Sequence, residues 1–135
     1  MIHVHEDAVA DLREVQRLRP KVFGRLMALI EQLRADFELS GKLLEHNFGS
    51  GQDEDISVSI WHNITRVERV QVWRLKAWDL EQRGMRYRLI YLYRWRDQSY
   101  TILAVVPRGR IDYDDPNHPL RQRISRRIRT EFCDA

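Results

Sequence analysis

Three strand-like segments follow one another between residues 70 and 106, and only short turns separate them. The segments are rich in β-branched and aromatic side chains, which favour strands, and they span residues 70–78, 85–95 and 100–106. The turns at residues 81–84 and 96–99 are too short for a helical crossover, which takes about a dozen residues or more. The pattern therefore predicts an antiparallel meander. The third segment is the most apolar, so we expect it at the centre of the sheet.

Two helices are predicted before the meander and one after it. Apolar residues recur at helical spacing through residues 8–18, and Asp7 stands where an N-cap is expected. A second helix is predicted from Pro20 to Gly41, and its apolar stripe contains Val22, Phe23, Leu26, Ile30, Leu33 and Phe37. A short strand at residues 2–4 precedes both helices. The helix at the end of the chain has an apolar stripe of Leu120, Ile124, Ile128 and Phe132.

This order of elements predicts an α+β fold, in which a small twisted antiparallel sheet carries the N-terminal helical hairpin on one face and is followed by a C-terminal helix. The other face of the sheet is expected to be free. The chain of 135 residues is long enough for one domain, spanning residues 1–135. Residues 41–69 are the least regular part, and we predict an insertion or long loop there with a brief strand at 56–60. This segment is either a binding loop or a surface insertion.

The basic residues are unusual in type and in position. Arginine supplies all but three of the 23 basic residues, the exceptions being Lys21, Lys42 and Lys76. Arginine is favoured where a planar group must grip a phosphate or a carboxylate. Residues 1–65 contain 7 basic and 11 acidic residues, whereas residues 66–135 contain 16 and 9. A basic half of this kind indicates a nucleic acid or an acidic protein as the partner.

Several of these cations occupy matching positions on the predicted strands. Arg74 and Lys76 project from the same face, because side chains alternate along a strand. Arg88 lies in the second segment, Arg108 follows the third, and Tyr113 comes next in a polar loop. If the strands are neighbours, these side chains converge on one concave surface. Cations in mid-strand must face water, acidic partners or a bound anion. The surface is therefore either a solvated face with scattered ion pairs or a phosphate site.

These segments resemble the RelE/ParE superfamily, the small toxins of type II toxin–antitoxin systems. The resemblance is carried, in order after a helical hairpin, by VWRLKA at residues 72–77, RYRLIYLY at 86–93 and ILAVVPRGRIDY at 102–113. It extends over nearly the whole chain and implies a small twisted antiparallel sheet with the hairpin packed on it. In the RelE branch the toxin enters the ribosomal A site and cuts mRNA with a set of basic residues and a tyrosine.

Carried over residue by residue, the resemblance implies a catalytic set of Arg74, Lys76, Arg88, Arg108 and Tyr113. At position 74 an arginine replaces the lysine of the family. The implied activity is that of an mRNA interferase, which inhibits translation by metal-independent attack of a 2′-hydroxyl on the adjacent phosphodiester. The implied partners are a cognate antitoxin, the ribosome and mRNA. The ParE branch, which poisons DNA gyrase, does not usually keep this set, and a non-catalytic RNA- or protein-binding module is a third interpretation.

Within this hypothesis Lys76 is the base, and Arg74 and Arg88 clamp the phosphate. Arg108 lies at the leaving oxygen, and Tyr113 stacks on a base. We expect further contacts with the substrate from Arg86, Arg110 and His118. No metal or cofactor is expected. His3 with His5, and the aspartates of residues 112–115, are interpreted as a strand end and as turn and cap residues.

The final helix carries five arginines, which either grip RNA or an acidic antitoxin segment or form a solvated face: Arg121, Arg123, Arg126, Arg127 and Arg129. No membrane partner is expected, because the longest uncharged stretch, residues 98–107, is shorter than the roughly 18 apolar residues of a membrane helix. The N-terminus has no pattern of a secretory signal. The chain has one cysteine, so we expect a reducing, cytoplasmic location.

Overall fold

The structure is a computed structural model that describes all residues from 1 to 135. It is an α+β fold built on one mixed sheet of five strands, in the order β1-β5-β4-β3-β2. The strands are β1 (Ile2–Val4), β2 (Ile56–Ile60), β3 (Gln71–Ala77), β4 (Tyr87–Arg94) and β5 (Ser99–Pro107). Strands β2 to β5 pair antiparallel, which confirms the predicted meander. Strand β1 makes the sheet mixed, since it pairs parallel to β5. The central strand is β4, and the more apolar β5 lies beside it.

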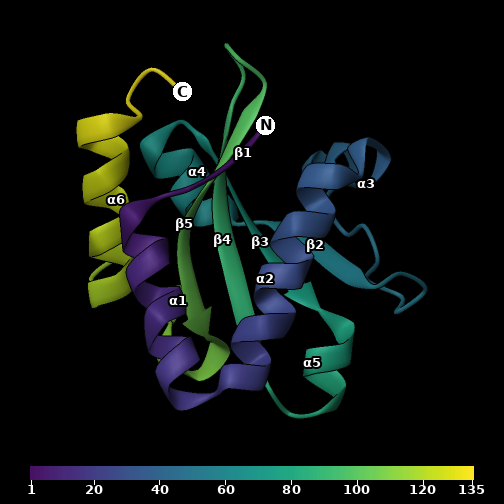
Figure 1. The fold of residues 1–135 in the computed structure, drawn as a ribbon. Coiled ribbons are helices and arrows are strands. Elements are labelled where there is room, and N and C mark those ends of the chain that lie inside the picture. The colour runs from purple at the N-terminus through teal and green to yellow at the C-terminus, as the bar shows by residue number, and fades with distance from the viewer.

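The helices and helical turns connect these strands as follows: α1 (Glu6–Leu18), α2 (Pro20–Ala35), α3 (Phe37–Gly41), η1 (Lys42–Leu44), α4 (His62–Glu68), α5 (Trp78–Gln82), η2 (Arg108–Arg110) and α6 (Pro119–Glu131). Helices α1 and α2 form the predicted hairpin and lie against one face of the sheet (Figure 1). Helix α1 begins two residues earlier than expected. The Nδ1 atom of His5 caps it by accepting from the Asp7 amide at 3.0 Å, and Asp7 lies in the first turn.

The second predicted helix is broken at Asp36. This residue has an extended backbone, and its carboxylate accepts from the Leu39 amide at 3.0 Å, so it caps a separate short helix, α3. The prediction that Phe37 belongs to the buried stripe is wrong, since the break turns its side chain into solvent with 91% of its surface exposed. The stripe of α2 ends at Leu33, which is buried against the sheet.

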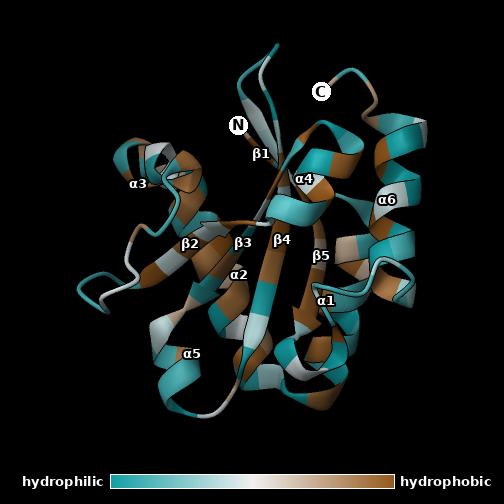
Figure 2. Cartoon of the chain, turned by 180° about the vertical axis from the view of Figure 1, so that it is seen from behind, coloured by the Kyte–Doolittle hydropathy of each residue, from teal (hydrophilic) through white to brown (hydrophobic).

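The second face of the sheet is not free, which corrects the expectation of a single covered face. Helices α4 and α6 pack on part of it through a second apolar cluster, in which Ile64, Ile124 and Ile128 meet Val72 and Leu92 of the strands. From behind, α4 crosses the upper part of β3 and β4, while no helix crosses the lower part of β4 (Figure 2). This uncovered end of the sheet carries the predicted site.

Residues 41–69 contain more regular structure than predicted. The alternation of isoleucine and serine does form a strand, β2, which pairs with β3 at the edge of the sheet. Helix α4 follows it and was not predicted. The longest part without helix or strand is residues 45–55, and it lies beside the uncovered end of the sheet. A second short helix, α5, stands where the first turn of the meander was expected.

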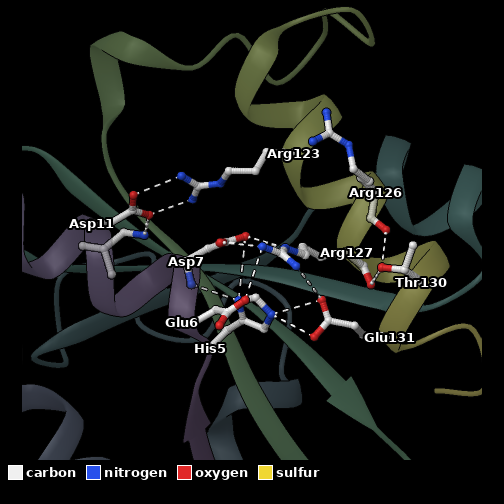
Figure 3. Close-up of polar contacts among 10 residues, drawn as sticks. His5, Glu6, Asp7, Asp11, Arg123, Arg126, Arg127, Thr130 and Glu131 are labelled. Atoms are coloured by element: carbon white, nitrogen blue, oxygen red, sulfur yellow. Dashed lines mark hydrogen bonds and ion pairs between the residues drawn. The ribbon is translucent and has the colours of Figure 1, made fainter.

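Helix α6 is joined to α1 by ion pairs (Figure 3). Arg123 binds the Asp11 carboxylate through two nitrogens at 3.0 and 2.7 Å, and Arg127 binds Asp7 at 2.9 and 3.1 Å. At the end of the helix, Glu131 lies 3.1 Å from Nε2 of His5. None of the helices has both the length and the apolar character needed to cross a membrane.

Candidate functional site

The register of the sheet places three of the predicted cations on the uncovered end of one face. Arg74 pairs with Ser59 of β2 on one side and with Ile90 of β4 on the other, and Lys76 pairs with Ser57. Arg88 precedes Leu89, the residue opposite Leu75, and therefore lies beside Lys76. All of these side chains except Leu75 and Leu89 share one face, because neighbouring residues in a strand point to opposite sides.

The last strand and the loop after it supply the remaining two residues. Arg108 begins η2 directly after β5, and its backbone N–H donates to the Arg86 carbonyl at 2.8 Å. Tyr113 is fixed by Trp61, whose indole N–H donates to the Tyr113 carbonyl at 3.2 Å. The Trp61 ring also meets the Tyr113 ring edge-on, with 4.9 Å between the centroids.

All five residues of the predicted catalytic set line one cavity of about 300 Å³. The rest of its lining is mostly polar: Asn47 and Ser50 from the loop, and Ser57 and Ser59 from β2. A second hollow of about 360 Å³ shares Lys76, Arg88 and Arg108 with the first, and adds Arg86 and Glu81. The cations are therefore gathered in one place and not scattered over the molecule.

Arg74 is the most constrained of these cations. Its Nε–H donates to Ser59 Oγ at 3.3 Å, and Nη2 lies 3.5 Å from the Ile60 carbonyl oxygen. The guanidinium carbon lies over the Tyr113 ring, 4.5 Å from its centroid. Burial lowers the pKa of Arg74 from its ordinary value, but a guanidinium remains charged in proteins. The Arg74 guanidinium is therefore held in one orientation and stays positively charged where it lines the cavity.

Lys76 has no carboxylate within ion-pair distance. Its ammonium lies over the Trp78 ring, 4.4 Å from the centroid. Burial lowers the pKa of Lys76, and the charges of Arg88, Arg108 and Arg74 lower it further, while Glu81 opposes them. A lysine in this setting releases its proton more readily than a lysine in water.

Arg88 is buried and forms an ion pair with Glu81 of α5. The same Arg88 nitrogen also donates to the Tyr87 carbonyl at 3.1 Å. Glu81 was not predicted, because the sequence assigned it to a turn. It supplies a carboxylate among the cations of the second hollow, and it holds Arg88 in place while competing with any anion that binds there.

Tyr113 lines the cavity as well, but its ring lies under the Arg74 guanidinium. Its hydroxyl is buried without a hydrogen-bond partner, and burial raises its pKa despite the nearby charges of Arg74, Arg88 and Arg108. One face of the ring is covered by Arg74, and Trp61 meets the ring edge-on. This places Tyr113 as the support of Arg74.

The three predicted substrate-binding residues are found in different places. Arg86 lines the second hollow with Lys76. Arg110 points into a different pocket of about 610 Å³ beside α1, with Asp11 and Glu14 in its lining. His118 lines neither cavity of the site, and its Nδ1 caps α6 by accepting from the Leu120 amide at 3.2 Å. The structure thus brings Arg86 to the site and leaves the other two outside it.

Most of the arginines of α6 are engaged within the molecule. Arg123, Arg127 and Arg129 pair with acidic residues, and Arg121 is buried and donates to Asn63 at 2.6 Å. Of the five, Arg126 has no side-chain partner, and its guanidinium points away from the cluster in Figure 3. Most of the α6 arginines thus connect this helix to α1 and α4, and they do not form an open basic surface.

The cavity has the composition of an anion site. Its arginine and lysine side chains can neutralise a phosphate, and the hydroxyls and the amide among them can donate or accept hydrogen bonds. The structure contains no group of three or more His, Cys, Asp or Glu side chains arranged to hold a metal ion. No family model, curated protein or solved structure matches this chain.

Proposed function

We propose that this protein is the toxin of a type II toxin–antitoxin system and acts in the cytoplasm as a ribosome-dependent mRNA endoribonuclease. The observation that carries the proposal is the cavity of about 300 Å³ that Arg74, Lys76, Arg88, Arg108 and Tyr113 line together. Four cations in one small cavity favour a ligand with concentrated negative charge, such as a phosphodiester.

The reaction that suits these side chains is transesterification within the RNA. The 2′-hydroxyl loses its proton and attacks the adjacent phosphorus, and the bond from phosphorus to the 5′-oxygen breaks. The products are a 2′,3′-cyclic phosphate and a 5′-hydroxyl, which takes up a proton. Lys76, whose pKa is lowered by burial and by its cationic neighbours, is the base that accepts the first proton.

In this mechanism the arginines stabilise the transition state. The attacked phosphate gains negative charge, and preorganised cations favour that state over the ground state. Arg88 is rigid because it is buried and paired, whereas Arg108 is exposed at the start of η2 and free to approach the leaving oxygen. Arg108 acts there by its charge, since a guanidinium is a poor proton donor.

Dependence on the ribosome follows from the resemblance and suits the form of the site. The cavity is small and open, and it can hold little more than one nucleotide unit of a flexible strand. Holding two reacting groups in line can lower a barrier by several kcal/mol, about 7–11 in model reactions. A partner that holds the strand would supply this positioning, and the ribosomal A site is such a partner in the RelE branch.

The ion pair between Arg88 and Glu81 favours a second candidate, a non-catalytic RNA-binding module. In that case Arg88 serves the fold, and the remaining cations only bind the phosphate backbone. The two candidates differ in product formation, since both predict salt-dependent binding to RNA. A gyrase inhibitor would instead cause DNA damage and leave mRNA intact.

The test is cleavage of mRNA on programmed bacterial ribosomes, read at nucleotide resolution. The wild type should cut the message in the A site. Replacing Lys76 by Met should slow cleavage by at least about 100-fold. The matched control is Lys21→Met in α2, an exposed lysine far from the cavity along the chain, which should cut at the wild-type rate. Wild-type cleavage by Lys76→Met, or no cleavage by the wild type, would refute the proposed function.

A further inference from the structure

We propose that the cavity contains a nucleobase subsite, in which a base of the RNA stacks on the Arg74 guanidinium while Asn47 and Ser50 contact its edge. The inference rests on the proposed function for the identity of the ligand as RNA. Arg74 would then bind a base instead of a phosphate. Residues 47–50 would contribute to the choice of substrate.

Arg74 is already fixed in the form that stacking requires. Two of its nitrogens are held by Ser59 and Ile60, and its guanidinium carbon lies over the Tyr113 ring, 4.5 Å from the centroid. In proteins that read single-stranded RNA, unpaired bases stack on aromatic rings or on guanidinium planes. Arg74 and Tyr113 both line the cavity, but Arg74 covers one face of the Tyr113 ring and the Tyr113 hydroxyl is buried, so Arg74 is the more open surface for a stacked ligand.

Tyr113 is a poor platform by comparison. Arg74 covers one of its faces, Trp61 meets the ring edge-on, and its hydroxyl is buried. A base could reach that face only by displacing Arg74 from its two hydrogen bonds. The geometry therefore favours a layered order of Tyr113, Arg74 and base.

The loop before β2 forms another part of the cavity wall and offers polar side chains without hydrogen-bond partners. Asn47 and Ser50 are exposed, line the cavity, and make no side-chain hydrogen bond. An amide both donates and accepts, and a hydroxyl does the same, so the pair can distinguish bases by the pattern of groups on their edges. Hydrogen bonds to a base edge require a wall that stays in place.

The backbone of this wall is held at three points. The Asn47 amide donates to the Val58 carbonyl at 2.9 Å, and the Val58 amide donates to the Phe48 carbonyl at 2.9 Å. The Trp78 indole donates to the Gly49 carbonyl at 2.7 Å. Trp78 in turn lies under Lys76, so the wall is tied to the catalytic side of the cavity.

The cavity also separates a base end from a phosphate end. Lys76, Arg88 and Arg108 line both hollows, whereas Arg74, Asn47 and Ser50 line only the first. A phosphate at the shared residues would leave the Arg74 end for the base attached to the neighbouring ribose. This is the arrangement in which a base contact can position the 2′-hydroxyl near Lys76.

The test measures binding, so it does not depend on cleavage. The probes are fluorescent RNA oligonucleotides with 2′-O-methyl riboses, which cannot undergo the reaction, carrying each of the four bases or an abasic site at one position in turn. Fluorescence anisotropy at fixed salt should show one position where loss of the base weakens wild-type binding about tenfold. At that position the four bases should bind with different affinities.

Two variants separate the platform from the edge contacts. Arg74→Lys keeps the charge and removes the plane, so base and abasic probes should bind within about twofold of each other. In the double variant Asn47→Gly with Ser50→Ala, the stacking gain should persist while the four bases become equal. Glycine is chosen at 47 because φ there is +69°, which glycine adopts without strain. The control is Gln98→Gly, another amide residue with positive φ (+53°), in the β4–β5 turn.

Two results would overturn the subsite: a wild-type affinity that no abasic position changes, or an Arg74→Lys variant that still prefers base over abasic probes. A base preference that survives the double variant would remove Asn47 and Ser50 from the proposal and so overturn its second half. Base-dependent binding by a wild type that never cuts ribosome-bound mRNA would refute the proposed nuclease function and support the subsite.

Discussion

At the scale of single residues, the pairing of Arg88 with Glu81 has opposite consequences for stability and for binding. Arg88 is buried, with 8% of its surface exposed, and Glu81 is its only carboxylate partner. Taking away one partner of a buried ion pair leaves the other charge uncompensated, which typically costs about 3 kcal/mol or more. In this site an anionic ligand can supply the missing charge.

We therefore expect Glu81→Gln to lower the free energy of unfolding by about 3 kcal/mol in chloride buffer. Sulfate, which can take the place of the lost carboxylate, should then stabilise the variant more than it stabilises the wild type. Urea unfolding with and without sulfate measures both effects. Glu54→Gln, at an exposed loop residue without an ion pair, is the control. Equal sulfate responses in variant and wild type would show that Arg88 is closed to external anions.

Lys76 gives a second residue-scale prediction, the dependence of cleavage on pH. Its pKa is lowered from the usual lysine value of 10.5, first by burial and then by the charge of Arg88. Only the neutral amine can accept the 2′-hydroxyl proton. The rate should therefore rise about tenfold per pH unit at neutral pH and level off below pH 10.5. Single-turnover cleavage on ribosomes across pH measures this profile.

The opposing charge of Glu81 makes the profile specific to Lys76. Glu81 raises the pKa of Lys76, so Glu81→Gln should move the plateau to lower pH. A rate that does not change with pH would assign the proton transfer to a group other than Lys76.

Alternation along a strand was enough to predict that Arg74 and Lys76 share a face, and the meander of neighbouring strands added Arg88, Arg108 and Tyr113. The resemblance added the roles of these residues. All five line the cavity. Glu81, Asn47 and Ser50 were not predicted, because their place depends on how α5 and the loop fold back over the sheet. No local periodicity carries that information. Ser57 and Ser59 did carry a signal, since they alternate with the buried Ile56 and Val58 and so must lie on the opposite face.

At the scale of elements, the conformation of the loop between η1 and β2 depends on one glycine. Gly49 has φ of +72°, and a Cβ atom there would lie 1.8 Å from the Ile56 carbonyl oxygen. Gly49→Ala should therefore lower the free energy of unfolding by about 2 kcal/mol or more, from backbone strain and from displacement of the loop. Urea unfolding measures the loss.

The neighbouring Gly51 provides the matched comparison. A Cβ atom at Gly51 would meet only Asp53 Oδ1, at 3.7 Å, so Gly51→Ala should be close to neutral. Equal effects of the two substitutions would mean that the loop does not hold the conformation described, and the nucleobase subsite would lose its second wall.

Elements with long, regular sequence patterns were predicted well. Short elements, whose ends depend on a single capping residue or on tertiary contacts, were not. The meander and the two N-terminal helices follow from periodicity over many residues. The break at Asp36 depends on one side chain that caps α3, and α5 replaces a turn within five residues. At that length a turn and a single helical turn have the same local composition, and tertiary contacts such as Glu81 with Arg88 decide between them.

At the scale of the whole molecule, the charge difference between the two halves of the chain has an internal use. The acidic first half supplies Asp7 and Asp11 on α1, and the basic second half supplies Arg123 and Arg127 on α6. These pairs join helices that are more than a hundred residues apart in sequence. Part of the arginine excess thus serves the fold, and another part lines the cavity and the hollow beside it.

This arrangement makes the docking of α6 sensitive to acid through Asp7. Burial alone would raise the pKa of Asp7, but the hydrogen bond and charge of Arg127, with His5 and Arg123 nearby, lower it below the usual value of 3.8. A carboxylate with a lowered native pKa contributes its full stability above the pKa of the unfolded chain. The contribution is lost as pH falls through the native pKa.

We expect Asp7→Asn to lower the free energy of unfolding by about 1 kcal/mol at pH 7, because Arg127 loses its bidentate partner. The difference from the wild type should shrink as pH falls below 4, where the wild-type carboxylate also becomes neutral. Urea unfolding of both proteins at several pH values measures the difference. Asp53→Asn, at an exposed residue without an ion pair, should show no such difference. If the gap between Asp7→Asn and the wild type stays constant down to pH 2, the contribution of Asp7 comes from packing or capping and not from its charge.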